Sequence, residues 1–143
     1  MTTVSGRSSP TPRPGVTPAS VGGAFLEALA SQDFDRLASV LSDDVRLRAL
    51  LPAGPSQWEG VDEIKARFIA WFGDADGFEL VDSIVGDIGP RLYLRWRVRM
   101  QAQRLGHGWF VVEQQAYADT DDDGRVRRLS LLCSGYLPEA PGG

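Results

Sequence analysis

The sequence predicts an α+β domain in which a curved antiparallel sheet wraps one face around N-terminal helices. Apolar residues recur at helical spacing as far as residue 72, and from Gly77 onward they alternate at a period of two. Glycine-rich and aspartate-rich turn signals separate the alternating runs. Helices followed by an antiparallel meander are the pattern of α+β folds.

The helical part is predicted from apolar periodicity and from end signals. Asp33 suits the N-cap of the second helix, because its carboxylate can accept a hydrogen bond from a free backbone N–H. Gly73 suits the C-terminal end of the third helix, which carries the clearest apolar stripe. The predicted helices are residues 21–31, 33–44 and 60–73.

The strand part predicts a sheet of four to five strands. Turn signals at 89–90, 106–108 and 121–124 separate the longer alternating runs. Residues 50–59, "LLPAGPSQWE", are predicted to form a loop before the third helix. The predicted strands are residues 45–50, 78–87, 90–104, 108–120 and 125–136.

The stretch "RLYLRWRVRM", residues 91–100, alternates strictly between apolar and mostly arginine positions. A strand therefore presents an apolar face with Trp96 at its centre and an opposite, outer face that is rich in arginine. Arg97 shares that outer face with Glu113, so we expect solvated cross-strand pairs there. A dimer interface and a phosphate-binding patch are the alternatives for this face.

The amino-acid composition limits the classes of protein to which this chain can belong. The chain of 143 residues, with 43% hydrophobic and 24% charged residues, suits one soluble domain at residues 19–137. Residues 1–18 are proline-rich and almost without apolar side chains, so they predict a flexible tail, and residues 138–143 a second one. The net charge of −4 disfavours nucleic-acid binding. No signal core or membrane span is found, and we expect a cytoplasmic protein without membrane contact.

Three stretches resemble one known family. They are "FLEALASQDFDRLASVLSDDVRLRA" (25–49), "WEGVDEIKARF" (58–68) and "DDDGRVRRLSLL" (121–132). Their order resembles the nuclear transport factor 2-like superfamily, and within it the SnoaL-like and ketosteroid-isomerase-like group. The resemblance implies a cone-shaped domain with a hydrophobic pocket between sheet and helices, and a homodimer formed through the outer face of the sheet.

The resemblance also locates three catalytic positions. Isomerases of this group use an aspartate base, a tyrosine and a protonated aspartic acid, whose pKa values are set by their surroundings. The matching positions here are Ala49, Phe25 and Ala116, and none of these side chains transfers a proton. We therefore expect no isomerisation by that mechanism.

A hydrophobic wall with few polar groups remains for the predicted pocket. Gln114 is the one strong hydrogen-bonding group of this wall. Its amide is either paired with a neighbouring side chain or a water, or it donates to the carbonyl of a ligand. His107, the only histidine, is either an exposed turn residue or an acid or base at the pocket rim. These two are the predicted catalytic residues. The predicted ligand-binding residues are Phe25, Ala49, Trp58, Trp96, Val112, Ala116, Leu131 and Cys133.

Three further features have a structural and a functional interpretation. Trp58 either packs on the third helix or forms a lid over the pocket. Cys133, the only cysteine, is a small buried hydrophobe or, with less support, a reactive thiol. "DTDDDG" at 119–124 resembles a calcium loop, but position twelve is Ser130 instead of glutamate, so we interpret it as a hairpin turn.

We expect the protein to bind a small hydrophobic molecule, polyketide-like or terpenoid- or steroid-like, and to act as a cyclase or isomerase mainly by shaping its substrate. The alternative is a non-catalytic ligand-binding or interaction module with a degenerate pocket. The sequence predicts no cofactor and no metal, and it does not identify the substrate.

Overall fold

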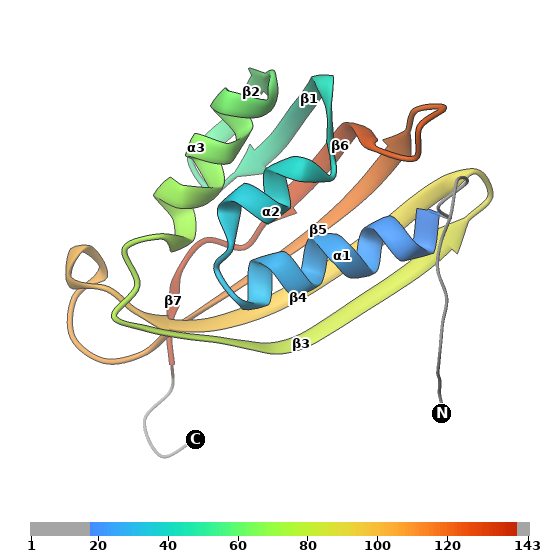
Figure 1. Ribbon diagram of the computed structural model, residues 1–143. Coiled ribbons are helices and arrows are strands. Elements are labelled where there is room, and N and C mark those ends of the chain that lie inside the picture. The colour runs from blue at the N-terminus through green and yellow to red at the C-terminus, as the bar shows by residue number, and fades with distance from the viewer. Residues whose placement is uncertain (1–17, 140–143) are drawn as a thin grey trace, which may run out of the picture.

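The computed structural model describes residues 18–139 and shows three helices on one face of a curved sheet (Figure 1). This confirms the predicted α+β fold. The helices are α1 (Pro18–Ala30), α2 (Phe34–Ser39) and α3 (Val61–Phe72), with a 3₁₀ turn at Gln103–Leu105. The strands are β1 (Leu41–Leu51), β2 (Gly54–Glu59), β3 (Gly77–Ile88), β4 (Arg91–Gln101), β5 (Phe110–Thr120), β6 (Val126–Cys133) and β7 (Leu137–Pro138).

The sheet has seven strands in the order β2-β1-β6-β5-β4-β3, with β7 paired to β5. The pair β1–β6 is parallel, which corrects the prediction of a fully antiparallel sheet with four to five strands. A parallel pair needs a long crossover connection, and here the connection consists of β2, α3 and the strands β3, β4 and β5. Buried partners fix this pair, because Leu47 lies beside Leu129 and Ala49 beside Leu131.

Two boundaries differ from the prediction. Strand β2 lies inside the predicted loop 50–59, where Pro55 is tolerated because β2 is an edge strand. The second helix has only six residues, and β1 begins at Leu41, since the apolar spacing around Val40 fits a helix and a strand equally well. The Asp33 N-cap is confirmed by the hydrogen bond that the Arg36 backbone N–H donates to its carboxylate.

The apolar parity of β4 faces the helices and forms the centre of the core, as the alternation predicted. Trp96 packs against Phe25 of α1, with ring centroids 5.5 Å apart, and against Phe68 of α3 at 6.5 Å. Phe25 and Phe68 also meet edge to face at 5.6 Å. One aromatic cluster thus joins two helices to the inner face of the sheet.

The limits of the described structure can be compared with the two predicted tails. Residues 1–17 and 140–143 of those tails lie outside the described residues. At the C-terminal side the described structure runs two residues past the predicted domain end, because Pro138 pairs with Phe110 and Glu139 forms an ion pair with Arg99. Among the described helices, none combines the length and apolar character that crossing a bilayer requires.

Arg104, in the connection between β4 and β5, closes the C-terminal end of α3. Its guanidinium donates hydrogen bonds to the carbonyl oxygens of Ala70 (3.1 Å) and Trp71 (2.8 Å) and to the carboxylate of Asp74 (2.7 Å). The Tyr136 hydroxyl donates to the same Trp71 oxygen at 2.7 Å. Burial raises the pKa of Tyr136 above its ordinary value, while Arg104 acts against this shift. These bonds satisfy carbonyl groups that a helix end leaves free.

Replacement of Arg104 by glutamine is expected to lower the free energy of unfolding by about 1 kcal/mol. The value lies below the upper range for hydrogen bonds from charged groups because 39% of the side chain is exposed. Urea unfolding measures the loss. Arg36→Gln is the matched control, since the Arg36–Glu27 pair is largely exposed and its removal should change stability much less. Equal losses in the two variants would contradict the capping role.

Candidate functional site

The structure places most of the predicted pocket residues on adjacent strands of the inner face. Trp96, Gln114 and Cys133 are successive cross-strand partners on β4, β5 and β6. Ala116 pairs with Leu131 one row further along. The predicted wall is therefore one continuous surface that faces the helices.

Gln114 is buried and has partners inside the protein. Its carbonyl oxygen accepts a hydrogen bond from the Trp96 indole N–H at 3.0 Å, and its amide nitrogen donates to the Cys133 sulfur at 3.3 Å. The Gly135 backbone N–H donates to the same sulfur at 3.4 Å. Because an indole N–H is only a donor, this pair fixes which end of the amide faces Trp96. One amide hydrogen of Gln114 remains for another acceptor.

The space in front of this wall is filled by side chains from the helices. Phe25, Trp96 and Ala116 have no exposed surface, and Ala49 is 4% exposed. A side chain without accessible surface touches no void large enough for a water molecule. Most positions predicted to contact a ligand thus belong to the packed core, whereas Trp58 and Cys133 are only partly buried.

Trp58 lies on β2 opposite Leu47 and packs against α3. Its ring meets Trp71 edge to face, with centroids 6.1 Å apart, and the Arg67 guanidinium lies 4.7 Å from the ring centroid. This is the contact expected from packing on the third helix. A role as a lid remains a prediction.

His107 lies apart from Gln114. It is exposed in the connection before β5, between two glycines with positive φ, Gly106 and Gly108. Gln114 lies four residues inside β5, which amounts to about 13 Å along the strand from Phe110. The structure thus places His107 in an exposed connection before β5 and Gln114 in the buried part of that strand.

The interior contains little that could move a proton. Within residues 21–139, the polar side chains that are buried are Ser42 and Gln114. Ser42 donates to Asp44 at 2.9 Å, near the start of β1. No cluster of three or more potential metal ligands occurs among the described side chains. Among the side chains of residues 21–139 that are buried, none is a carboxylic acid, a histidine or a lysine.

The turn "DTDDDG" joins β5 to β6, as expected for a hairpin. The Asp121 carboxylate accepts hydrogen bonds from the backbone N–H groups of Asp123 (2.9 Å) and Arg125 (3.0 Å). Asp119 forms an ion pair with Arg91. These carboxylates therefore organise the turn and the sheet face beside it.

A hollow of about 680 Å³ lies on the outer face of the sheet, opposite the helices. It crosses β2, β1, β6 and β5, and we call it the outer groove. Its side chains include Arg48, Leu50, Pro55, Gln57, Tyr117 and Leu132. This groove was not predicted from the sequence. The available signal was the leucine doublets at 50–51 and 131–132, each of which places one leucine on each face of the sheet.

The arginines of β4 on the outer face are paired, as predicted for a solvated face. Arg97 contacts Glu113 at 2.9 Å, and Arg95 contacts Asp82 at 3.1 Å. Arg99 bonds Glu79 and Glu139, and the hydrogen bond from Arg99 lowers the pKa of Glu139. The charge of these arginines is therefore locally balanced.

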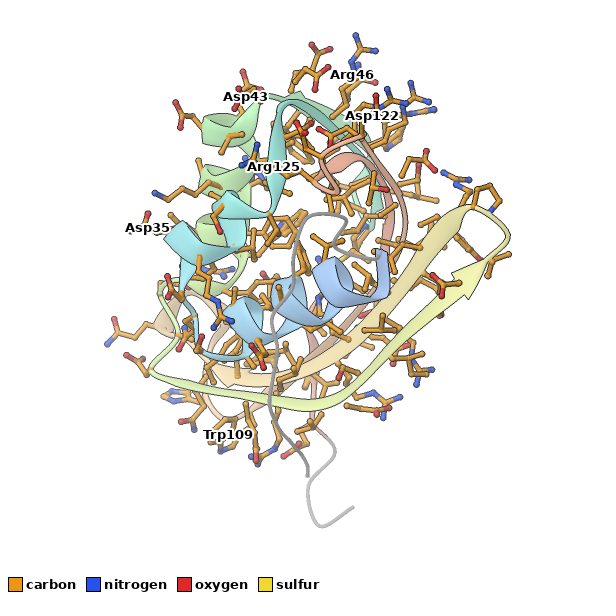
Figure 2. All side chains as sticks on the ribbon, turned by 45° about the vertical axis from the view of Figure 1, so that its right-hand side comes forward. Asp35, Asp43, Arg46, Trp109, Asp122 and Arg125 are labelled. Carbon is orange, nitrogen blue, oxygen red and sulfur yellow. The ribbon has the colours of Figure 1, made fainter. Side chains whose placement is uncertain are left out.

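A second, polar hollow of about 480 Å³ lies at one end of the sheet. Figure 2 shows Asp43 and Arg46 at this end of the molecule, where the β5–β6 turn with Asp122 and Arg125 also lies. Arginines and carboxylates line it in equal number, so it favours neither ligand charge. The charged lining residues are Asp43, Asp44, Arg46, Glu59, Arg127 and Arg128.

Comparisons with known proteins agree on the fold. The family model of the SnoaL-like domain matches residues 23–129. Similar solved structures include an epoxide hydrolase of M. tuberculosis described as LEH-like, at 23% identity, with 85% of this chain and 86% of that chain covered and a TM-score of 0.63. No curated protein gives a significant match.

Two other similar structures have lower sequence identity. A candidate SnoaL-like polyketide cyclase from Shewanella denitrificans OS-217 is 12% identical, with 82% and 90% of the two chains covered and a TM-score of 0.64. A phenazine biosynthesis-related protein from Pseudomonas aeruginosa is also 12% identical, with 82% and 77% covered and a TM-score of 0.62. At these identities the likeness concerns the fold.

The Trp96–Gln114 hydrogen bond is expected to give a measurable coupling energy. Trp96→Phe leaves the Gln114 carbonyl buried without its donor, and Gln114→Leu leaves the indole N–H unpaired, each at about 1–3 kcal/mol besides packing changes. The double variant removes both partners. It should therefore lose less stability than the sum of the single losses, by about 1 kcal/mol or more.

Urea unfolding of the four proteins measures this coupling. Trp96→Phe combined with Arg36→Gln is the control, and its losses should add. If the losses of Trp96→Phe and Gln114→Leu also add, the hydrogen bond contributes nothing net to stability.

Proposed function

The chain belongs to the SnoaL-like domain family, and we propose that it is a binding member of that family without catalytic activity. In this proposal the space between helices and sheet is a structural core, and ligands bind at the surface. The observation that most supports this proposal is the interior of the domain, which is packed and has no acid or base among its described buried side chains. Phe25, Ala49 and Ala116 are the residues that the sequence resemblance matches to the catalytic positions of isomerases, and all three are buried.

The family relationship does not by itself supply an activity. One similar structure is a candidate polyketide cyclase and another is an epoxide hydrolase, and both reactions need groups that handle protons. A fold can keep its shape while its site residues change, so function is argued from the site. Here the inner face supplies one amide, Gln114, already bonded on both ends.

A cyclase or isomerase that shapes its substrate is the second candidate. What favours it is the single polar group of Gln114 in an apolar wall, with one amide hydrogen free for a ligand carbonyl. Such an enzyme would hold a small hydrophobic molecule, polyketide-like or terpenoid- or steroid-like. Its substrate would have to displace Phe25 from Trp96, where the rings now pack at 5.5 Å.

A saturating concentration of benzene is expected to leave the melting temperature of the native protein unchanged. A packed core has no room for it, whereas an apolar cavity of sufficient size binds benzene and gains stability from it. Phe25→Ala is the positive control, because the lost ring opens such a cavity at a cost of about 3–5 kcal/mol. Phe25→Leu replaces it if that variant does not fold. A rise in the native protein would contradict the proposal.

We also expect no isomerisation of a Δ5-3-ketosteroid. The absorbance of the conjugated enone product measures the reaction, and a known ketosteroid isomerase is the control for the assay. The physical reason is that no buried acid or base occurs within residues 21–139. Robust turnover by the purified native chain would show that Phe25, Ala49 and Ala116 do not mark the catalytic positions.

A further inference from the structure

We propose that the outer groove binds a small apolar carboxylate, an aromatic or alkyl acid, with Arg48 as its counter-charge. The inference rests on the proposed function in one respect, which is that binding occurs at the surface and not in the interior. The groove volume of about 680 Å³ falls within the range of small-molecule sites, about 300–1,000 Å³.

The sheet register arranges the groove in two rows across neighbouring strands. In the first row Pro55, Leu50 and Leu132 are cross-strand neighbours, which gives an apolar strip. The leucines are 52% and 45% exposed. Exposed leucines that adjoin one another on a sheet face offer hydrocarbon surface to a ligand body.

The second row lies two residues away along the strands, which is about 7 Å. It runs from Gln57 through Arg48 and Ser130 to Tyr117. The Tyr117 ring is held on its far side by Tyr93, with centroids 5.4 Å apart. A guanidinium thus lies between two neutral hydrogen-bonding groups, and an aromatic ring closes the row.

Charge identifies the ligand class. The arginines of β4 on the same sheet face have carboxylate partners, whereas Arg48 forms no ion pair with any carboxylate in residues 18–139. Its cross-strand neighbours Gln57 and Ser130 are neutral. A guanidinium binds a carboxylate through two parallel hydrogen bonds. One such group next to an apolar strip fits a monocarboxylate with a hydrocarbon body.

The test compares 2-naphthoate with its neutral analogue 2-naphthalenemethanol by calorimetric titration of the full-length protein. The native chain should bind the acid about tenfold or more tightly than the alcohol, which corresponds to about 1.4 kcal/mol. Arg48→Gln should remove this preference. Arg97→Gln, the control on the same sheet face outside the groove, should keep it.

Several results would overturn the proposal. Equal binding of acid and alcohol would remove the role of charge, and equal losses in the two arginine variants would remove the role of Arg48. Failure of the acid to bind native protein while benzene also leaves its melting temperature unchanged would reject the groove ligand but not the packed interior.

The predicted homodimer through the outer face is the competing occupant. Sedimentation of the native protein and of Leu132→Asp distinguishes the two. A monomer, or a dimer that still binds the acid, supports the small-molecule site. A dimer that Leu132→Asp dissociates, with no acid bound by the native protein, would assign the groove to a second copy of the chain.

Discussion

The burial of the Trp96 indole is the interaction on which the rest of the structure depends. Its ring occupies the place where α1, α3 and β4 meet, in contact with Phe25 and Phe68. An indole N–H buried there needs an acceptor, because an unpaired one costs about 1–3 kcal/mol. Gln114 on the next strand provides it and is held in turn by Cys133 on the strand after. This chain of contacts favours one register for three strands, since a slip by one residue would turn every side chain to the opposite face.

The same packing also affects whether a ligand could bind between the helices and the sheet. Phe25 and Trp96 place two aromatic rings in contact in the space between the helices and the sheet. Filling that space adds buried apolar area, worth about 25 cal/mol per Å², and removes the room in which a substrate would be held. Stability and interior binding therefore compete for the same volume, and the proposed function assigns that volume to stability, since Phe25 and Trp96 are buried.

Sequence patterning predicted the parts of the fold that rest on local periodicity. The alternation at 91–100 assigned Trp96 to the core and the arginines to the outer face, because apolar residues at every second position indicate a strand with one buried face. It did not predict β2, whose Gly54 and Pro55 resemble loop residues unless the edge position is known. The parallel pairing of β1 with β6 depends on contacts across most of the chain, which no local pattern encodes. The ring contacts of Phe25 with Trp96 and Phe68 were not predicted either, since inward orientation on a strand does not tell how closely the helices approach.

On the outer face of the sheet, two positions depart from the alternation of apolar and polar side chains. Strict alternation would place a polar side chain at Leu50 and at Leu132, and both positions instead expose hydrocarbon to solvent. A single exposed leucine is ordinary on a folded protein, whereas two that adjoin each other form a patch of exposed hydrocarbon. The two leucines adjoin each other across the β1–β6 pair, beside an arginine with no carboxylate partner among the described residues. Two departures from the ordinary sheet surface, one apolar and one electrostatic, therefore coincide on one hollow, and a ligand with both characters satisfies them together.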